Sequence, residues 1–188
     1  AVLSVLNQSY KNIEIIIVVD GSPDNAYCVC QNLQATHSNI RLVKHEVNKG
    51  ASATRNTGIS ISKGEYILFL DSDDTLLPDA IKDMLEIIIE DNSDAVYPEK
   101  YIRKYMNQDD SFEKRYFDKD CCISNPLKFA SDVIIEKSTA WGTTAILYKR
   151  SIICNNSLEF TVGITAEDIL FNLEYLKCVE KISEVFIY

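Results

Sequence analysis

The sequence is short of positive charge. It has 19 lysines and arginines against 28 aspartates and glutamates among 188 residues, a formal net charge of −9. A general nucleic-acid binder needs a basic face, so this class is disfavoured. No apolar run reaches the length of a membrane span, and the six cysteines include no Cys-x-x-Cys pair that would favour zinc. What remains is a chain with 46% hydrophobic residues, long enough for one sizeable globular domain.

The first half of the sequence alternates short apolar runs with helix-like segments. The expected strands are Ile13–Val19, Ile40–Glu46 and Glu65–Leu70, and the expected helices after them are Asn25–Ser38, Ala51–Ser62 and Pro78–Glu90. This rhythm predicts the α/β class, with a mostly parallel sheet and crossover helices.

The rhythm breaks after Pro98, and residues 99–120 show no clear period. Further on we expect a strand at Thr139–Lys149, a helix at Ala166–Cys178 and a last strand at Ile182–Tyr188. We therefore divide one domain into a nucleotide-binding half, residues 1–98, and a more irregular half, residues 99–188.

Three carboxylates follow the third apolar run: Asp71, Asp73 and Asp74. In open α/β sheets, ligands bind beyond the carboxyl ends of the strands. If the segment is extended, Asp71 and Asp73 point to the same side and can hold Mg²⁺ or Mn²⁺ beside phosphate oxygens. The alternative is a turn followed by a helix N-cap. Asp74 has no assigned role.

Two other segments of the first half suit a nucleotide. Asp20, at the end of the first run, precedes Gly21 and can accept hydrogen bonds from a base or ribose; the alternative is a plain turn. Lys49 and Arg55 lie in a small-residue segment and could face a diphosphate; the alternative is a pair of solvated charges.

Glu167 and Asp168 open the helix expected at Ala166–Cys178. Carboxylates are favoured at helix N-termini by the helix dipole, so simple capping explains them. A general base at the lip of a pocket explains them equally well.

These motifs together resemble a family 2 glycosyltransferase of the GT-A fold. The motifs are Asp-Gly-Ser at 20–22, Asn-Lys-Gly at 48–50 followed by Ala-Ser-Ala-Thr-Arg-Asn-Thr-Gly at 51–58, Tyr-Ile-x-Phe-Leu-Asp-Ser-Asp-Asp at 66–74, and Glu-Asp-x-x-Phe-Asn at 167–172. The resemblance implies a Rossmann-like domain that transfers a sugar from a nucleotide-diphosphate donor with inversion of the configuration at the anomeric carbon. The donor is expected to be a UDP-sugar.

The resemblance also implies roles for single residues. Asp20 would contact the nucleoside, Arg55 would lie near the nucleotide, and Asp71 would touch ribose or metal. Asp73 would ligate Mn²⁺ or Mg²⁺, which acts as a Lewis acid on the leaving phosphate. Asp168 would take the proton from the acceptor hydroxyl.

The expected acceptor is a glycan or lipid-linked hydroxyl in surface polysaccharide synthesis, in the cytoplasm or at the cytoplasmic face of the membrane. Two departures from the family pattern stand out: the opening strand that ends in a Pro-x-Tyr-Asn-like segment is absent, and Val19 replaces the first of two aspartates. We therefore expect a fragment without its first strand. Trp141 could stack on a sugar or pack in the core.

Two rival functions remain. The segment Asp71–Thr75 also fits the Asp-x-Asp-x-Thr pattern of haloacid-dehalogenase phosphatases, with Asp71 as nucleophile and Asp73 as acid and base. That pattern normally follows the first strand, whereas other strand candidates precede it here. The second rival is a non-catalytic module that binds a nucleotide-sugar.

Overall fold

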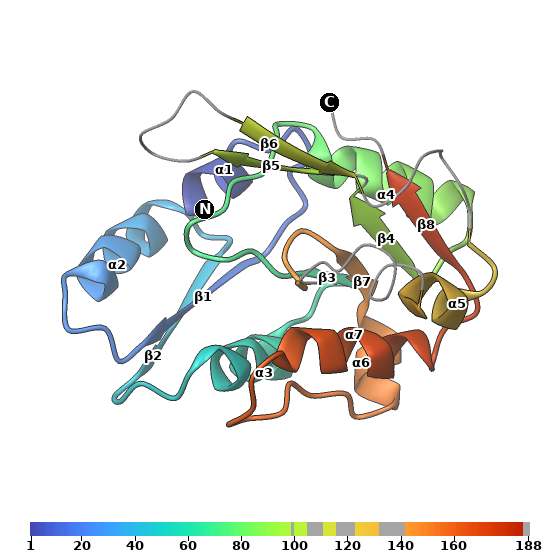
Figure 1. The fold of residues 1–188 in the computed structure, drawn as a ribbon. Helices are drawn as coiled ribbons and strands as arrows, with labels where there is room; N and C mark the ends of the chain where they lie inside the picture. Colours follow the sequence, from blue (N-terminus) through green and yellow to red (C-terminus); the bar gives the residue numbers. More distant parts are fainter. Residues whose placement is uncertain (99, 105–110, 116–122, 132–141, 186–188) are drawn as a thin grey trace.

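The computed structural model describes residues 1–98, 100–104, 111–115, 123–131 and 142–185. Figure 1 shows its elements. In chain order they are α1 (Val2–Leu6), β1 (Ile15–Asp20), α2 (Ala26–Thr36), β2 (Ile40–His45), α3 (Ala51–Ile61), β3 (Tyr66–Leu68), α4 (Ala80–Glu90), β4 (Ala95–Pro98), β5 (Lys100–Lys104), β6 (Ser111–Arg115), α5 (Pro126–Ser131), β7 (Leu147–Lys149), α6 (Arg150–Asn155), α7 (Glu167–Leu176) and β8 (Ile182–Val185).

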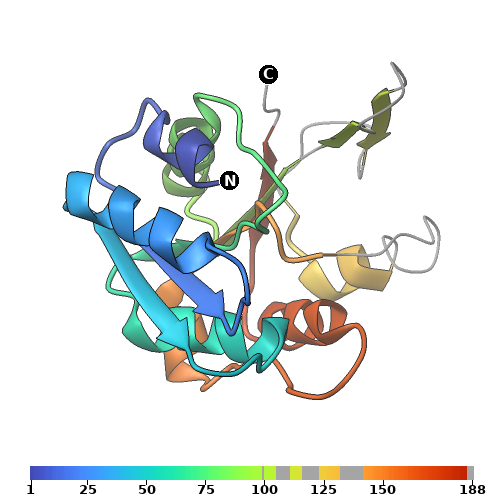
Figure 2. The ribbon, with the colours of Figure 1, turned by 90° about the vertical axis from the view of Figure 1, so that its left-hand side faces the viewer.

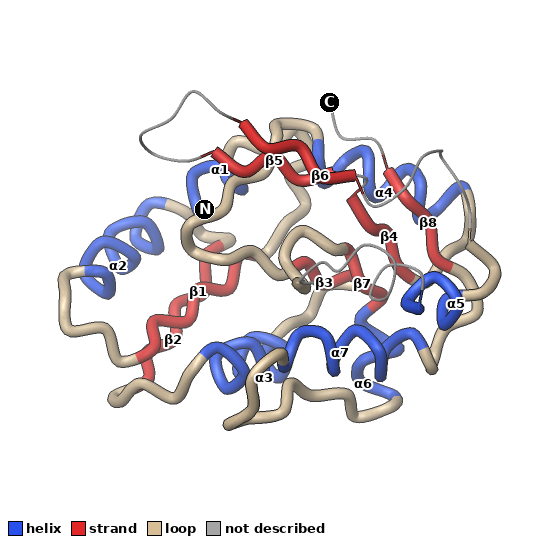
Figure 3. The backbone as a smooth tube through the Cα atoms, in the orientation of Figure 1, coloured by secondary structure: helices blue, strands red, loops and turns tan. Residues whose placement is uncertain are grey.

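The strands form two main sheets, in which most strands run in the same direction as the other strands of their sheet. β1 and β2 are parallel, in a register that runs from Ile15 opposite Ile40 to Asp20 opposite His45. The second sheet has the order β3-β7-β4-β8, in which β4 and β8 are parallel and β7 is antiparallel to both β3 and β4. Helices flank these sheets (Figure 3). The predicted α/β class with a mostly parallel sheet is confirmed.

The strand predicted at Thr139–Lys149 is much shorter in the structure. Only Leu147–Lys149 forms β7, because Ala145 has φ +58° and interrupts the extended backbone. The start of the prediction, residues 139–141, lies outside the described residues, and so does Trp141. The predicted last strand is β8, and its residues 186–188 are likewise not described.

Some elements were not predicted at all. β5 and β6 pair as an antiparallel hairpin inside the stretch without a clear period, and α5 and α6 are short helices. The hairpin lies at the end of the molecule opposite α3 and α7 (Figures 1 and 2).

Successive side chains of β7 point to opposite faces of the sheet and pack into two separate parts of the hydrophobic core. Leu147 packs with Met84 and Ile88 of α4, while the adjacent Tyr148 packs with Phe171 and other residues of α7. Tyr148 and Phe171 are both 0% exposed. α4 and α7 therefore cover opposite faces of the sheet, and the buried face of α7 fixes its first turn relative to the end of β3. Within the described part of the chain, no helix has the length and apolarity to span a membrane.

Candidate active site

Asp20 lies at the carboxyl end of β1 and ties three segments together. Its register partner His45 donates from Nδ1 to Oδ1 at 2.6 Å, and the backbone N–H groups of Lys49 and Gly50 donate at 3.0 and 2.8 Å. Gly21 is required next to it, because φ is +61° and a Cβ would stand 2.2 Å from the backbone nitrogen of Asn48. The Asp-Gly-Ser motif thus brings β1 against the loop that begins α3.

These contacts determine the charge state of Asp20. Partial burial by itself raises the pKa of Asp20, but the hydrogen bonds from His45, Lys49 and Gly50 favour the carboxylate and hold the pKa below its ordinary 3.8. The negative charge also lies at the N-terminus of α3, where the helix dipole favours it.

Asp20→Asn is expected to lower the free energy of unfolding at pH 7 by about 1–3 kcal/mol, because an amide nitrogen would face N–H donors. Since the folded pKa lies below that of the unfolded chain, the carboxylate stabilises the fold above pH 3.8 and less so as pH falls through the folded value. Urea unfolding measures both effects: the difference between wild type and variant should shrink only at pH values below 3.8.

A matched control is Asp24→Asn, since Asp24 is an exposed aspartate that also accepts hydrogen bonds, from Ser22 and Ala26. It should change stability less than Asp20→Asn. An Asp20→Asn protein as stable as the wild type at pH 7 would show that the three donors do not need the negative charge.

The three carboxylates after β3 lie on a turn. The backbone N–H of Asp74 donates to the carbonyl oxygen of Asp71 at 3.1 Å, with Ser72 and Asp73 in the turn. The segment is therefore not extended as expected, because this hydrogen bond reverses the backbone between Asp71 and Asp74. Asp73 is exposed and, among the described residues, makes no hydrogen bond or ion pair.

Asp74 is held by Thr144. Its Oδ2 accepts a hydrogen bond of 2.9 Å from the hydroxyl of Thr144, whose oxygen also lies 3.4 Å from the backbone nitrogen of Asp71. Thr144 in turn pairs with Phe69 in a β-bridge. The turn is thus fastened to the segment before β7, which gives Asp74 the anchoring role that the sequence left open.

Arg55 joins the two carboxylate groups of the site. Its Nη2 lies 3.0 Å from Oδ1 of Asp71 and its Nη1 lies 3.0 Å from Oε1 of Glu167. The Arg55 side chain is 14% exposed and that of Asp71 46%, so the cation is the more enclosed partner. The sequence left Glu167 without a role; the structure makes it the second anion of this bridge. Lys49, by contrast, is exposed.

Asp168 lies next to Gly142. An added Cβ on Gly142 would stand 3.7 Å from Oδ2 of Asp168. Asn172, one helical turn further along α7, donates to the carbonyl oxygen of Gly142 at 3.2 Å. Residues four apart share a helix face, so Asp168 and Asn172 both face the segment before β7. Ala166 precedes this turn in the left-handed conformation, with φ 63°.

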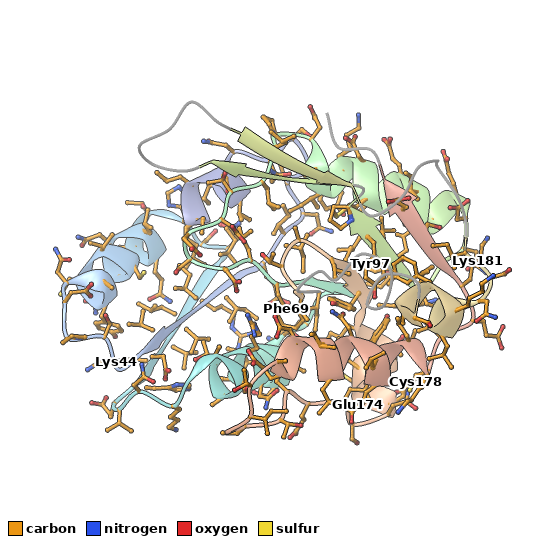
Figure 4. All side chains as sticks on the ribbon, in the orientation of Figure 1. Lys44, Phe69, Tyr97, Glu174, Cys178 and Lys181 are labelled. Carbon is orange, nitrogen blue, oxygen red and sulfur yellow. The ribbon has the colours of Figure 1, made fainter. Side chains whose placement is uncertain are left out.

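Aromatic rings pack beneath the charged groups. Phe160 stacks on Phe171 at 4.0 Å with parallel planes, and Phe69 meets both edge-on at 5.2 and 6.0 Å. The Arg55 guanidinium lies 5.2 Å above the Phe160 ring. Figure 4 places Phe69 near the junction of α3 and α7. This aromatic cluster holds the ends of β3 and α7 together.

The donor set suits a hard divalent cation. Carboxylate oxygens are the protein ligands that Mg²⁺ and Mn²⁺ prefer. Among the described residues, no three His, Cys, Asp or Glu side chains are grouped so that they could hold an ion alone. One or two carboxylates completed by substrate phosphates are the usual arrangement for Mg²⁺. Asp73 and Asp71 therefore fit a cation shared with a diphosphate.

Sequence reasoning missed the residues that hold the site from a distance: His45, Thr144 and Asn172. Asn172 belongs to the quoted Glu-Asp-x-x-Phe-Asn motif, and its spacing of four from Asp168 was the available signal. The buried residues of α7 are Phe171, Asn172, Tyr175 and Leu176. A search for an apolar stripe does not detect a buried polar residue such as Asn172.

The sequence matches Glycosyl transferase family 2 over residues 1–153, and the chain belongs to that family. It is 36% identical over 180 residues to the poly(ribitol-phosphate) beta-N-acetylglucosaminyltransferase TarP of Staphylococcus aureus strain N315. That match covers 92% of this chain and 51% of TarP, so the chain spans about half the length of this relative. Membership in this family removes the phosphatase alternative.

Solved structures share the fold. S. aureus TarS 1-349 in complex with UDP-GlcNAc has a TM-score of 0.81 at 20% identity, covering 100% of this chain and 51% of the TarS 1-349 chain. A mannosyltransferase from Pyrobaculum calidifontis in complex with GDP-Man and Mn²⁺ has a TM-score of 0.64 at 16% identity, covering 100% of this chain and 52% of that one.

Proposed function

We propose that the chain carries the catalytic site of an inverting glycosyltransferase that uses a UDP-sugar and a hydroxyl acceptor. The observation that carries this proposal is the Arg55 bridge, which holds Asp71 and Glu167 at 3.0 Å each. It sets the turn that can receive a diphosphate opposite the first turn of α7, where Asp168 can receive an acceptor. Inversion needs these two functions on opposite sides of the sugar.

On the donor side, Asp73 and Asp71 would hold Mn²⁺ or Mg²⁺. The cation, when bound, would neutralise charge on the leaving diphosphate. Asp20 would lie on the nucleoside side and hold the loop there, since the N–H of Lys49 bonds to both of its oxygens and the N–H of Gly50 to one. Arg55 would lie beside the diphosphate, next to Asp71.

On the acceptor side, Asp168 would accept the proton of the acceptor hydroxyl. As that oxygen forms its bond to the anomeric carbon, the bond between sugar and diphosphate breaks, and the nucleoside diphosphate leaves. Gly142 keeps the space next to the Asp168 carboxylate free of a side chain. The name of TarP supports a polymeric hydroxyl acceptor, and the UDP-GlcNAc bound to TarS supports a UDP-linked donor. Surface polysaccharide synthesis at the cytoplasmic membrane face is the setting that we propose.

Calorimetric titration of the protein with UDP, UDP-GlcNAc and GDP tests the proposal. We expect UDP to bind in Mn²⁺ or Mg²⁺ and at least about tenfold more weakly in EDTA, because two carboxylates and a diphosphate repel each other without a cation. No metal-dependent binding of any nucleotide would contradict the proposal. Binding without hydrolysis or transfer would favour the non-catalytic module instead.

A further inference from the structure

One face of α3 holds the segment that leads into α7. Ser52, Arg55 and Asn56 are three and four positions apart, so they share this face. Ser52 Oγ donates to the carbonyl oxygen of Thr161 at 3.0 Å, and Arg55 donates to Glu167 at 3.0 Å. α3 and α7 lie side by side in Figure 1.

Asn56 makes the tightest of these contacts. Its Nδ2 donates to the carbonyl oxygen of Phe160 at 2.8 Å, and its Oδ1 accepts from the backbone N–H of Phe160 at 2.8 Å. A side-chain amide offers a donor and an acceptor at once, whereas a carboxylate or an alanine does not. Asn56 thus satisfies both backbone groups of one residue that lies 104 positions away.

Phe160 passes this constraint to the carboxylates. Its ring is 1% exposed and stacks on Phe171, which lies three positions after Asp168 in α7. The same ring meets Phe69, two positions before Asp71. A shift of Phe160 would therefore move the helix that carries Asp168 relative to the turn that carries Asp71.

The segment between Phe160 and Glu167 has little packing of its own. Residues 161–166 are all exposed, with Val162 at 60% and Ile164 at 43%. Gly163 and Ala166 have positive φ. The entry to α7 therefore depends on the contacts at its two ends, with Phe160 at one and Glu167 at the other.

We infer that Asn56 is a positioning residue for Asp168, acting through the backbone and ring of Phe160; the inference rests on the proposed role of Asp168. Asn56→Ala should lower kcat for UDP-GlcNAc hydrolysis in Mn²⁺ by about 10- to 100-fold, because a misplaced catalytic group costs this much. The Kd for UDP should stay within about twofold, because both polar atoms of the Asn56 side chain are already bonded to the backbone of Phe160.

Asn56→Asp provides a test that loss of packing would not mimic. A protonated carboxyl group has one donor and one acceptor, as the amide does, whereas the carboxylate only accepts. The kcat of Asn56→Asp divided by that of wild type should therefore rise as pH falls, while the same ratio for Asn56→Ala stays flat. A flat ratio for both variants would overturn the inference.

Asn39→Ala is the matched control, since Asn39 Nδ2 also donates to a backbone oxygen, that of Ile13 at 3.0 Å, away from α7. Equal losses of kcat in Asn56→Ala and Asn39→Ala would overturn the inference. Amide hydrogen exchange tests the inference independently of catalytic activity. Asn56→Ala should raise the exchange rate in residues 160–168, and unchanged protection there would overturn the inference. Failure of the wild type to bind UDP would instead count against the proposed function.

Discussion

Asp168→Asn is expected to stop sugar transfer while leaving donor binding intact. The amide keeps the size of the side chain next to Gly142 but cannot take a proton at neutral pH. General-base catalysis contributes typically about 10²–10⁴-fold, so kcat should fall by that factor. The Kd for UDP in Mn²⁺ should not change, because the proposed donor contacts lie on Asp20, Asp71 and Asp73.

The measurement is release of UDP from UDP-GlcNAc, together with calorimetry of UDP. Glu174→Gln is the control, because it removes the same charge from the same helix; Figure 4 shows Glu174 on α7 away from Phe69. A normal rate in Asp168→Asn would remove Asp168 as the base. A parallel loss of UDP binding would mean that Asp168 belongs to the donor site.

Asp73→Ala is expected to remove the dependence of UDP binding on Mn²⁺. Changing an outer-shell partner of a metal ligand costs about 10- to 100-fold in metal affinity, and a direct ligand should cost at least the upper figure. Asp73→Ala should lower the affinity for UDP in Mn²⁺ without lowering the stability of the fold, since Asp73 is exposed and bonds to no other described residue. Calorimetry of UDP with Mn²⁺ and with EDTA measures both states.

Asp79→Ala provides the comparison. Asp79 is an exposed aspartate a few positions further along the same loop, at the start of α4, and its side chain makes no capping hydrogen bond. It should leave Mn²⁺-dependent UDP binding unchanged. If Asp73→Ala binds UDP as the wild type does, with the same response to EDTA, the cation is held elsewhere and the assignment of Asp73 is wrong.

Much of the first half could be predicted because its signals are local. The β-branched run that contains Ile15–Val19 is a strand, and the small-residue segment that contains Ala51–Ile61 is a helix. The positions of Asp20 and Asp71 at strand ends followed from the same runs. Only the extended conformation assumed for Asp71–Asp74 failed, since a single turn hydrogen bond decides it.

The connections within the site could not be predicted. Arg55 and Glu167 are 112 positions apart, and Asn56 and Phe160 are 104 apart. No periodicity encodes such pairs, since they arise only when α3 and α7 are packed by the core. The hairpin of β5 and β6 was missed for a related reason: its register is set by cross-strand pairing, and its sequence lacks a clean alternation.

The antiparallel strand β7 has a consequence for how the chain folds. β3 and β4 are close in sequence, yet each is bonded to β7, which is synthesised about 50 residues after β4. In the first 98 residues the edges of β3 and β4 that face β7 therefore stay unpaired until residue 149 is available. Such non-local pairing slows folding and exposes strand edges to aggregation in the meantime. The boundary expected at residue 98 would separate the proposed donor residues from Asp168, but the pairing of β4 with β7 crosses it.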